Sequence, residues 1–365
     1  MEPVKSVYLH IPFCETICSY CDFCKVYYRK EWVDRYLDYL KQEVKEAYRG
    51  ERMSTIYIGG GTPSSLSLDQ LQKLANIVAL IHREDDCEFT FECNLEHMTA
   101  AKLELLKKMG VTRISYGIQT FHPHYLTFLH RQHTFDDVQA KIKLTKQYFQ
   151  SINVDFMYAF PGETIAEVEA DLQQFLKLEV PHISTYSLII EPHTLLAYQK
   201  VDYIDDVLDA AMYACIETTL KRFGYRHYEV SNYAKQGYES QHNLTYWNNQ
   251  PYYGFGLSAS GYLDGIRYEN THSITRYLQG KRQYQHHLLS KQEQMENEMI
   301  LGLRKLDGVS LVDFESKYHV AMTAVFPIEN LIEEGKLELV NNRVRIPDHL
   351  IYLSNDILIQ FIGEA

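Results

Sequence analysis

Three cysteines, Cys14, Cys18 and Cys21, form a C-x3-C-x2-C pattern near the start of the chain. Thiolates hold zinc ions and iron–sulfur clusters, and three thiolates on a four-iron cluster leave one iron with an open position. A structural zinc site needs a fourth ligand, for which His10 or Cys24 could serve, but no second pair of ligands follows at a typical spacing. The pattern therefore favours an iron–sulfur cluster over zinc.

Glycine and polar residues occur at the ends of several segments, later in the chain, whose sequence is typical of β-strands. The stretch 59–62, Gly-Gly-Gly-Thr, permits close backbone approach to a ligand, and it lacks the G-x-G-x-x-G spacing of a dinucleotide site. Glu92 and Gln119 end two further segments, and Asp155 lies within a third. Carboxylates can accept hydrogen bonds from ribose hydroxyls, while Gln119 and Arg131 suit the polar end of a ligand. Together these residues predict one wall of a binding site.

Six short segments rich in β-branched and aromatic residues must position these groups. The segments are 7–13, 54–61, 88–94, 113–121, 152–162 and 182–190. Their starts lie roughly 25 to 50 residues apart with helical patterns between them, which is the spacing of β-α units in a parallel sheet. Six units predict an α/β fold with an incomplete (β/α)6 barrel similar to a TIM barrel, although periodicity alone also allows a doubly wound sheet. In such barrels, chemistry lies at the C-terminal ends of the strands.

The sequence pattern changes after about residue 233, where aromatic and glycine-rich sequence gives way to helical patterns. We therefore expect a core barrel over residues 1–235 and a smaller C-terminal α+β domain over residues 236–365. Asn341 and Asn342 are expected at the turn of a short hairpin that precedes a last helix. Further helices are expected around 273–279, 291–306, 310–318 and 324–335.

The composition limits the classes of function. A formal net charge of −12 argues against nucleic acid as a partner, because phosphate binding needs clustered basic residues. There is no signal-peptide pattern and no apolar run long enough for a transmembrane helix, so a cytoplasmic protein is expected. In that compartment 7 cysteines, with four packed at the front, indicate metal or redox chemistry rather than disulfides.

The cysteine pattern follows the first predicted strand directly, and Tyr20 supplies an aromatic residue before the third cysteine. In both respects the chain resembles the radical S-adenosylmethionine (radical SAM) superfamily. The resemblance implies a [4Fe-4S] cluster bound by Cys14, Cys18 and Cys21, with its open iron chelated by S-adenosylmethionine. It also implies that electron transfer to the sulfonium can release a 5′-deoxyadenosyl radical.

Within that superfamily the chain resembles the HemN-like, coproporphyrinogen-dehydrogenase branch over nearly its whole length. The matching motifs are Y-x-H-I-P-F-C, G-G-G-T-P, E-C-N, S-Y-G-I-Q-T-F, L-H-R-Q-H and V-D-F-M-Y-A-F-P-G-E-T. The residues that resemble the S-adenosylmethionine contacts of that branch are Tyr8, Tyr20, Gly60, Gly61, Thr62, Glu92, Gln119, Arg131 and Asp155. Leu95 and His130 depart from the usual proline and glycine, which affects fine contacts rather than the family.

Two departures from the dehydrogenase are instead features of the HemW type of haem chaperone. Phe23 stands where the dehydrogenase has a fourth cysteine, and Tyr8 is only the eighth residue where the dehydrogenase carries a long preceding segment. The stretch H-N-L-T-Y-W at His242–Trp247 matches a motif typical of HemW proteins and proposed there to mark haem binding. The resemblance thus implies that His242 is a haem ligand. The alternative is that His242 and Asn243 cap a turn while the aromatic residues fill an interdomain seam.

The resemblance implies a cytoplasmic chaperone that binds haem and delivers it to haem-requiring acceptor proteins such as respiratory enzymes. Its cluster and S-adenosylmethionine pocket would support a homodimer or the release of haem, and contact with a membrane would be peripheral. We expect no coproporphyrinogen dehydrogenase activity. Two enzymatic alternatives stay open, an oxygen-independent coproporphyrinogen III dehydrogenase and a radical enzyme that acts on haem itself.

Overall fold

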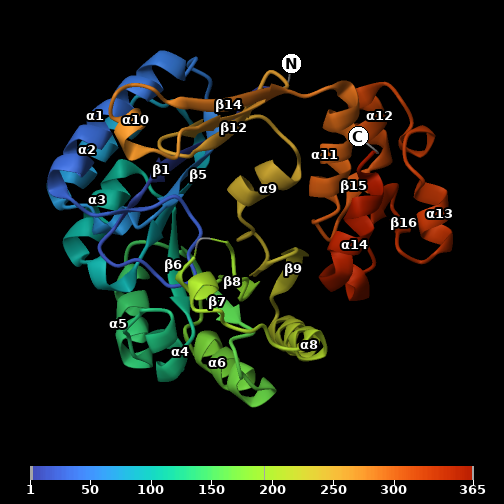
Figure 1. Ribbon diagram of the computed structural model, residues 1–365, viewed down its shortest axis with the longest axis horizontal. Helices are drawn as coiled ribbons and strands as arrows, with labels where there is room; N and C mark the ends of the chain where they lie inside the picture. Colours follow the sequence, from blue (N-terminus) through green and yellow to red (C-terminus); the bar gives the residue numbers. More distant parts are fainter. Residues whose placement is uncertain (1–2, 193, 364–365) are drawn as a thin grey trace.

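The computed structural model describes residues 3–192 and 194–363, and its central feature is a 12-stranded sheet. Six neighbouring strands of this sheet are parallel and are the six that the sequence predicts. They are β1 (Ser6–Ile11), β4 (Met53–Gly60), β5 (Arg83–Cys93), β6 (Arg113–Gln119), β7 (Ser151–Tyr158) and β8 (His182–Ser187). They follow one another in space as in the chain, so the sheet is not doubly wound, and they form an open, incomplete barrel (Figure 1).

The helices that connect these strands lie along the outside of the curved sheet (Figure 1). They are α1 (Lys30–Ala47), α2 (Leu68–Val78), α3 (Ala100–Met109), α4 (Pro123–Phe128), α5 (Phe135–Thr145) and α6 (Ile165–Lys177), and α7 (Leu195–Tyr198) and α8 (Asp206–Arg222) follow β8. Apolar side chains at three- and four-residue spacing fasten them to the sheet. In α1, for example, Val33, Leu37, Leu40 and Val44 are all buried.

Alternation along each strand separates an apolar outer face from a polar inner face. In β6, Ile114 and Ile118 are fully buried in the hydrophobic core, whereas Arg113, Ser115 and Gln119 line a cavity inside the barrel. Successive strand residues point to opposite faces, so this alternation follows directly from the sequence. A β/α barrel is usually filled by layers of apolar side chains. Here the inner face is polar and leaves room for a ligand.

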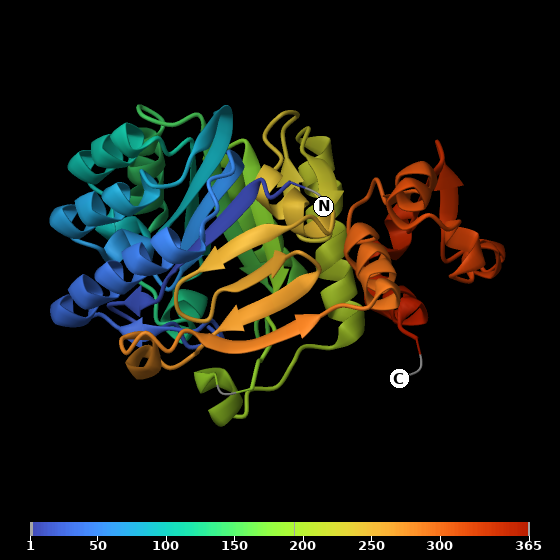
Figure 2. The same cartoon turned by 90° about the horizontal axis from the view of Figure 1, so that it is seen from above.

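Further strands extend both edges of the sheet. β11 (Tyr252–Phe255) pairs with β1 in parallel, and β12 (Ser260–Leu263), β13 (Ile266–Asn270) and β14 (Gln283–Leu288) continue antiparallel (Figure 2). At the other edge, β10 (Asn232–Ala234) and β9 (Arg226–Glu229) are antiparallel to β8. The domain division after residue 235 stays a prediction, and the central sheet itself continues past that residue to Leu288.

The remaining chain forms a smaller unit at one end of the molecule (Figures 1 and 2). Its elements are α11 (Lys291–Gly302), β15 (Val309–Ser310), α12 (Leu311–Tyr318), α13 (Ile328–Glu333), β16 (Glu338–Val340), β17 (Arg343–Arg345) and α14 (Ser354–Leu358). The predicted hairpin is confirmed, with Asn341 and Asn342 both at positive φ between β16 and β17. Helix α11 joins this unit to the barrel through α9 (Gln241–Trp247), and α10 (Ile274–Tyr277) lies before β14. None of the helices described here is long and apolar enough to cross a membrane.

Candidate cofactor site

A cavity of about 300 Å³ lies inside the barrel, at the C-terminal ends of the parallel strands. It is lined by Cys14, Cys18 and Cys21 together with eight of the predicted contact residues, namely Tyr20, Gly60, Gly61, Thr62, Glu92, Gln119, Arg131 and Asp155. Tyr8 lies outside this lining, where its hydroxyl is 2.9 Å from Nδ1 of His10 and its ring is 6.0 Å from that of Tyr57. The fold thus brings the predicted set to one cavity, with Tyr8 behind the wall.

The cysteine loop is held at both ends. Two short parallel strands, β2 (Phe13–Cys14) and β3 (Val26–Tyr27), pair across its base. Inside the loop, the Lys25 ammonium donates to the carbonyl oxygens of Cys21 and Phe23. These contacts close the loop at its base, and none of its cysteines forms a disulfide.

The cysteine side chains that line the cavity offer sulfur ligands of the kind that hold iron–sulfur clusters. Among the described residues, no group of three or more His, Cys, Asp or Glu side chains is arranged to hold a metal ion. The donor set of three cysteines fits a four-iron cluster in which one iron keeps an open position. Burial raises the pKa of the Cys14 thiol to about 11, so a cationic centre is needed to favour its thiolate.

The glycine triplet supports the cysteine segment. The N–H groups of Gly61 and Thr62 donate to the carbonyl oxygens of Ile11 and Phe13 at 2.9 Å each, and the Thr62 hydroxyl donates to the Cys14 sulfur at 3.4 Å. A Cβ atom on Gly61 would lie 2.7 Å from the carbonyl carbon of Pro12 and 3.0 Å from the Cys14 sulfur. Gly61 therefore leaves room for the backbone of the cysteine segment.

Two carboxylates face the cavity with raised pKa values. Glu92 accepts hydrogen bonds from the Tyr57 hydroxyl at 2.6 Å and from the Gly60 N–H at 2.9 Å. Burial raises the pKa of Glu92 to about 7, against the lowering effect of those two bonds. Burial likewise raises the pKa of Asp155 to about 6, while its hydrogen bond from the Asn153 amide at 2.8 Å lowers it. Near neutral pH both groups can change protonation when a ligand binds.

Three polar atoms in the cavity wall have no hydrogen-bond partner within the protein. They are Oε1 of Gln119, Nε of Arg131 and Oγ1 of Thr90, and all three are buried. A buried polar atom without a partner costs about 1–3 kcal/mol, and native proteins rarely leave one unexplained. Arg131 is held in place by donation from Nη1 to the Gly117 carbonyl oxygen at 2.7 Å. The unpaired atoms indicate that the cavity receives a polar ligand.

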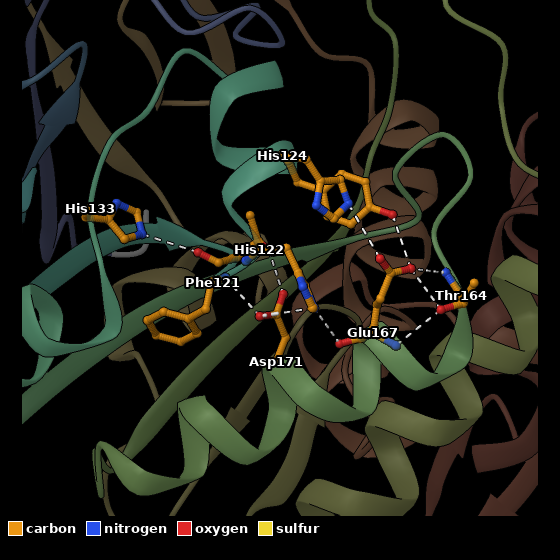
Figure 3. A network of polar contacts seen from close by, with 9 residues as sticks. Phe121, His122, His124, His133, Thr164, Glu167 and Asp171 are labelled. Carbon is orange, nitrogen blue, oxygen red and sulfur yellow. Dashed lines mark hydrogen bonds and ion pairs between the residues drawn. The ribbon is translucent and has the colours of Figure 1, made fainter.

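A turn follows Gln119, the last residue of β6, and a carboxylate from α6 anchors that turn (Figure 3). Gln119 has φ of 77°, a conformation that costs a residue other than glycine about 1–3 kcal/mol. Asp171 accepts from the Thr120 hydroxyl at 2.6 Å and from the Phe121 N–H at 2.8 Å. His133 lies on the other side, 3.2 Å from the Thr120 carbonyl oxygen. These contacts hold the strained residue at the cavity wall.

The sequence reasoning missed several polar residues of the inner wall. Tyr57, Arg113, Asn153, His182 and Ser184 all line the cavity. Arg113 and Asn153 lie an even number of residues from the predicted contact residues Gln119 and Asp155 on the same strands, and His182 and Ser184 lie two residues apart on β8. Tyr57 does not follow this rule. The available signal was therefore the two-residue periodicity of polar side chains within the strands.

His242, the predicted haem ligand, lies in a buried position with hydrogen-bond partners at both ring nitrogens. The residue is 1% exposed, and burial lowers its pKa to about 3. Its Nδ1 lies 2.7 Å from Oγ1 of Thr55, and its Nε2 lies 2.8 Å from the Tyr246 hydroxyl. A ring nitrogen must offer a free lone pair to bind iron, and both nitrogens are engaged inside the protein. Of the neighbouring aromatic residues, Tyr253 and Phe255 are buried, whereas Tyr246, Trp247 and Tyr252 are partly exposed.

Comparison with known proteins first identifies the class. Residues 8–175 match the radical SAM superfamily, and residues 289–349 match the HemN C-terminal domain. The solved structure of coproporphyrinogen III oxidase (HemN) from Escherichia coli superimposes with a TM-score of 0.87, covering 99% of this chain and 90% of that one at 20% identity. The fold is that of a radical SAM protein with a HemN-like architecture.

Comparison with relatives then narrows the class to a family. The "Heme chaperone HemW" of Lactococcus lactis is 39% identical over 99% of this chain and 98% of its own length. The proteins of the same name from Bacillus subtilis and Escherichia coli are 38% and 32% identical, and each alignment covers 99% of this chain. They are covered over 100% and 99% of their own lengths. The chain belongs to the HemW family.

Proposed function

We propose that this protein is a cytoplasmic haem chaperone that holds a [4Fe-4S] cluster with S-adenosylmethionine, binds haem and passes it to haem-requiring acceptor proteins such as respiratory enzymes. The observation that carries the proposal is similarity over essentially the full length to proteins named heme chaperone HemW. Phe23, in place of a fourth cysteine, supports the chaperone over the dehydrogenase.

The cavity would hold the cluster on Cys14, Cys18 and Cys21, and S-adenosylmethionine against the neighbouring wall. When bound, such a cluster supplies an open iron position for the ligand and a route for electrons to its sulfonium. Glu92 and Asp155 are placed to accept hydrogen bonds from the ligand, and they favour cationic or hydroxyl-bearing parts of it. The unpaired atoms of Gln119 and Arg131 would then gain partners.

Haem itself would be the cargo, and exposed aromatic side chains could pack against its flat macrocycle. Phe23, which lines the cavity, is 64% exposed. Tyr27, also in the cysteine segment, is 61% exposed.

The test is a haem titration of the purified full chain, followed through the Soret band. We expect saturable binding near one haem per chain, and transfer of that haem to an apo-acceptor when the two are mixed. Absence of saturable binding would contradict the proposal. An anaerobic assay with coproporphyrinogen III, a reductant and S-adenosylmethionine separates the alternatives, because formation of the decarboxylated product would replace the chaperone with the dehydrogenase. An altered tetrapyrrole after incubation with haem would favour the enzyme that acts on haem.

The same proposal includes a homodimer whose formation depends on the cluster and S-adenosylmethionine, and peripheral contact with membranes that carry an acceptor. Sedimentation of reconstituted protein with and without S-adenosylmethionine tests the dimer. A mass that stays monomeric in both conditions would contradict that part. Flotation with acceptor-containing and acceptor-free vesicles tests the membrane contact, which we expect only with the acceptor.

A further inference from the structure

Helix α9, which carries the H-N-L-T-Y-W stretch, closes the end of the barrel opposite the cysteine loop. Ser240, its N-cap, and Asn243 line the same cavity as the cysteines. The backbone N–H groups of Gln241 and His242 donate to the Glu88 carboxylate of β5 at 3.2 and 3.0 Å. The stretch therefore forms the floor of the cavity.

A chain of hydroxyl groups favours one tautomer of the His242 ring. Thr245 donates to the Gln241 carbonyl oxygen at 3.2 Å, and Thr55 donates to the Ser6 hydroxyl at 2.9 Å. Ser6 lies 2.8 Å from the Thr245 hydroxyl and donates to it when Thr245 donates to Gln241. With the Thr55 proton directed to Ser6, Nδ1 of His242 carries a proton and donates to Thr55, 2.7 Å away.

The other ring nitrogen is then an acceptor. With its proton on Nδ1, neutral His242 accepts the Tyr246 hydroxyl at Nε2 over 2.8 Å. The lone pair that an iron atom would need is used in that bond. Binding of iron would require the ring to leave both partners and a site where it is 1% exposed.

The ring also packs against a residue that bonds to the cofactor wall. The centroids of the His242 and Tyr57 rings are 5.0 Å apart, with an interplanar angle of 31°. The Tyr57 hydroxyl donates to Oε1 of Glu92 at 2.6 Å. A displacement of His242 would therefore reach Glu92 through one intervening side chain.

From these contacts we infer that His242 is a positioning residue of the S-adenosylmethionine site, which holds Tyr57 and through it the Glu92 carboxylate, and that it is not the ligand of haem iron. The inference rests on the binding of S-adenosylmethionine that is part of the proposed function. It assigns the stretch a role at the floor of the cavity, and haem binds elsewhere on the chain.

The experiment measures two affinities on the full chain after anaerobic cluster reconstitution. One is the Kd for S-adenosylmethionine, by calorimetry or equilibrium dialysis, and the other is haem binding by the Soret band. We expect His242→Ala to raise the Kd for S-adenosylmethionine about tenfold, as when one hydrogen bond to a charged group is weakened. Iron content and the Soret titration should match the wild type. His349→Ala, at an exposed histidine of the C-terminal unit, is the matched control.

Two more conservative substitutions keep the inference testable if His242→Ala fails to fold. Tyr57→Phe keeps the ring beside His242 and removes the hydroxyl that bonds to Glu92, so it should weaken S-adenosylmethionine binding in the same way. Tyr246→Phe removes the hydroxyl that occupies Nε2. If His242 bound iron, this change would free its lone pair and tighten or shift the haem spectrum, whereas we expect no change.

Three results would overturn the inference. One is an unchanged Kd for S-adenosylmethionine in both His242→Ala and Tyr57→Phe. Another is a lost or shifted Soret band in His242→Ala with intact affinity for S-adenosylmethionine. Failure of the wild type to bind S-adenosylmethionine at all would refute the proposed role of the cavity, and the inference with it. That last result is distinguishable because it appears before any substitution is made.

Discussion

Glu92 offers the sharpest single perturbation of the cavity. Its two carboxylate oxygens accept from two fixed donors, the Tyr57 hydroxyl and the Gly60 N–H. Glu92→Gln keeps the size and shape of the side chain but leaves one oxygen and one amide N–H2 group. Because the amide nitrogen cannot accept, one of the two donors loses its partner.

The expected size of the effect follows from those contacts. A buried donor without a partner costs about 1–3 kcal/mol, which lowers the free energy of unfolding by that amount. A hydrogen bond from ligand to a charged acceptor contributes about 1.5–3 kcal/mol, so its loss should raise the Kd for S-adenosylmethionine by about 10- to 150-fold. The cysteine loop is untouched, so the iron content should stay at the wild-type value.

The pH dependence of S-adenosylmethionine binding shows whether the Glu92 carboxylate causes the difference in affinity. The pKa of Glu92 is raised to about 7 by burial, and a ligand that donates to the carboxylate selects its ionised form. Wild-type affinity should therefore be full above pH 7 and fall up to tenfold per unit as the pH drops below it, and Asp155 adds to the slope below about 6. In Glu92→Gln the step near pH 7 should disappear. Calorimetric titration between pH 5.5 and 8.5 measures this, and equal affinity and slope in the two proteins would refute the reasoning.

Three further predictions concern the supports of the cavity. Asp171→Ala should weaken S-adenosylmethionine binding, because the turn that holds Gln119 loses both bonds to α6. Glu167→Gln, in the same helix but bonded to Thr164, is the control, and equal affinities would contradict the anchoring role. Gly61→Ala should lower the iron per chain after reconstitution, since the added Cβ meets the Pro12 carbonyl carbon at 2.7 Å, and normal loading would contradict that reading. The ligand-free protein should lose stability to denaturant as the pH rises from about 4.5 to 7, because the raised pKa of Glu92 makes the folded state bind its proton more tightly than the unfolded chain; a flat profile would contradict it.

The local sequence was sufficient to predict the strands and turns whose formation depends on neighbouring residues. The six strands follow β-branched runs, and the turn at Asn341 and Asn342 follows from the tolerance of asparagine for positive φ. The placement of Cys14, Cys18 and Cys21 around one cavity was also predictable, because the C-terminal ends of parallel strands meet at one edge.

Contacts between segments that are distant in the chain could not be predicted from the local sequence. The approach of a ligand to Gly61 stays a prediction, whereas the close contact of Gly61 with the backbone at Pro12 was not predicted. His242 was expected to be a haem ligand, and nothing in the local pattern indicated that its ring contacts Thr55, which lies 187 residues earlier in the chain. A motif states which residue types occur together, whereas the direction of a side chain is decided by the strands packed around it.

The inner wall carries a more general signal. Ser115, Asn153, Asp155 and Ser184 alternate with apolar residues that pack outward, as in an ordinary half-buried strand. If the interior of the barrel were filled with apolar side chains, nothing would explain polar residues at these buried positions. Their recurrence on consecutive strands indicates a lumen that holds a ligand, and it would have located the cavity floor as well as its rim.

The most direct test of the account is the metal and sulfide content of the anaerobically reconstituted chain, with its low-temperature EPR spectrum after reduction. We expect about four irons and four sulfides per chain, as a [4Fe-4S] cluster requires, and a spectrum that changes when S-adenosylmethionine is added. Cys18→Ser should abolish the cluster, while Cys215→Ser, far from the loop in the chain, should leave it intact. One zinc and no iron per chain, or a cluster spectrum indifferent to S-adenosylmethionine, would contradict the account.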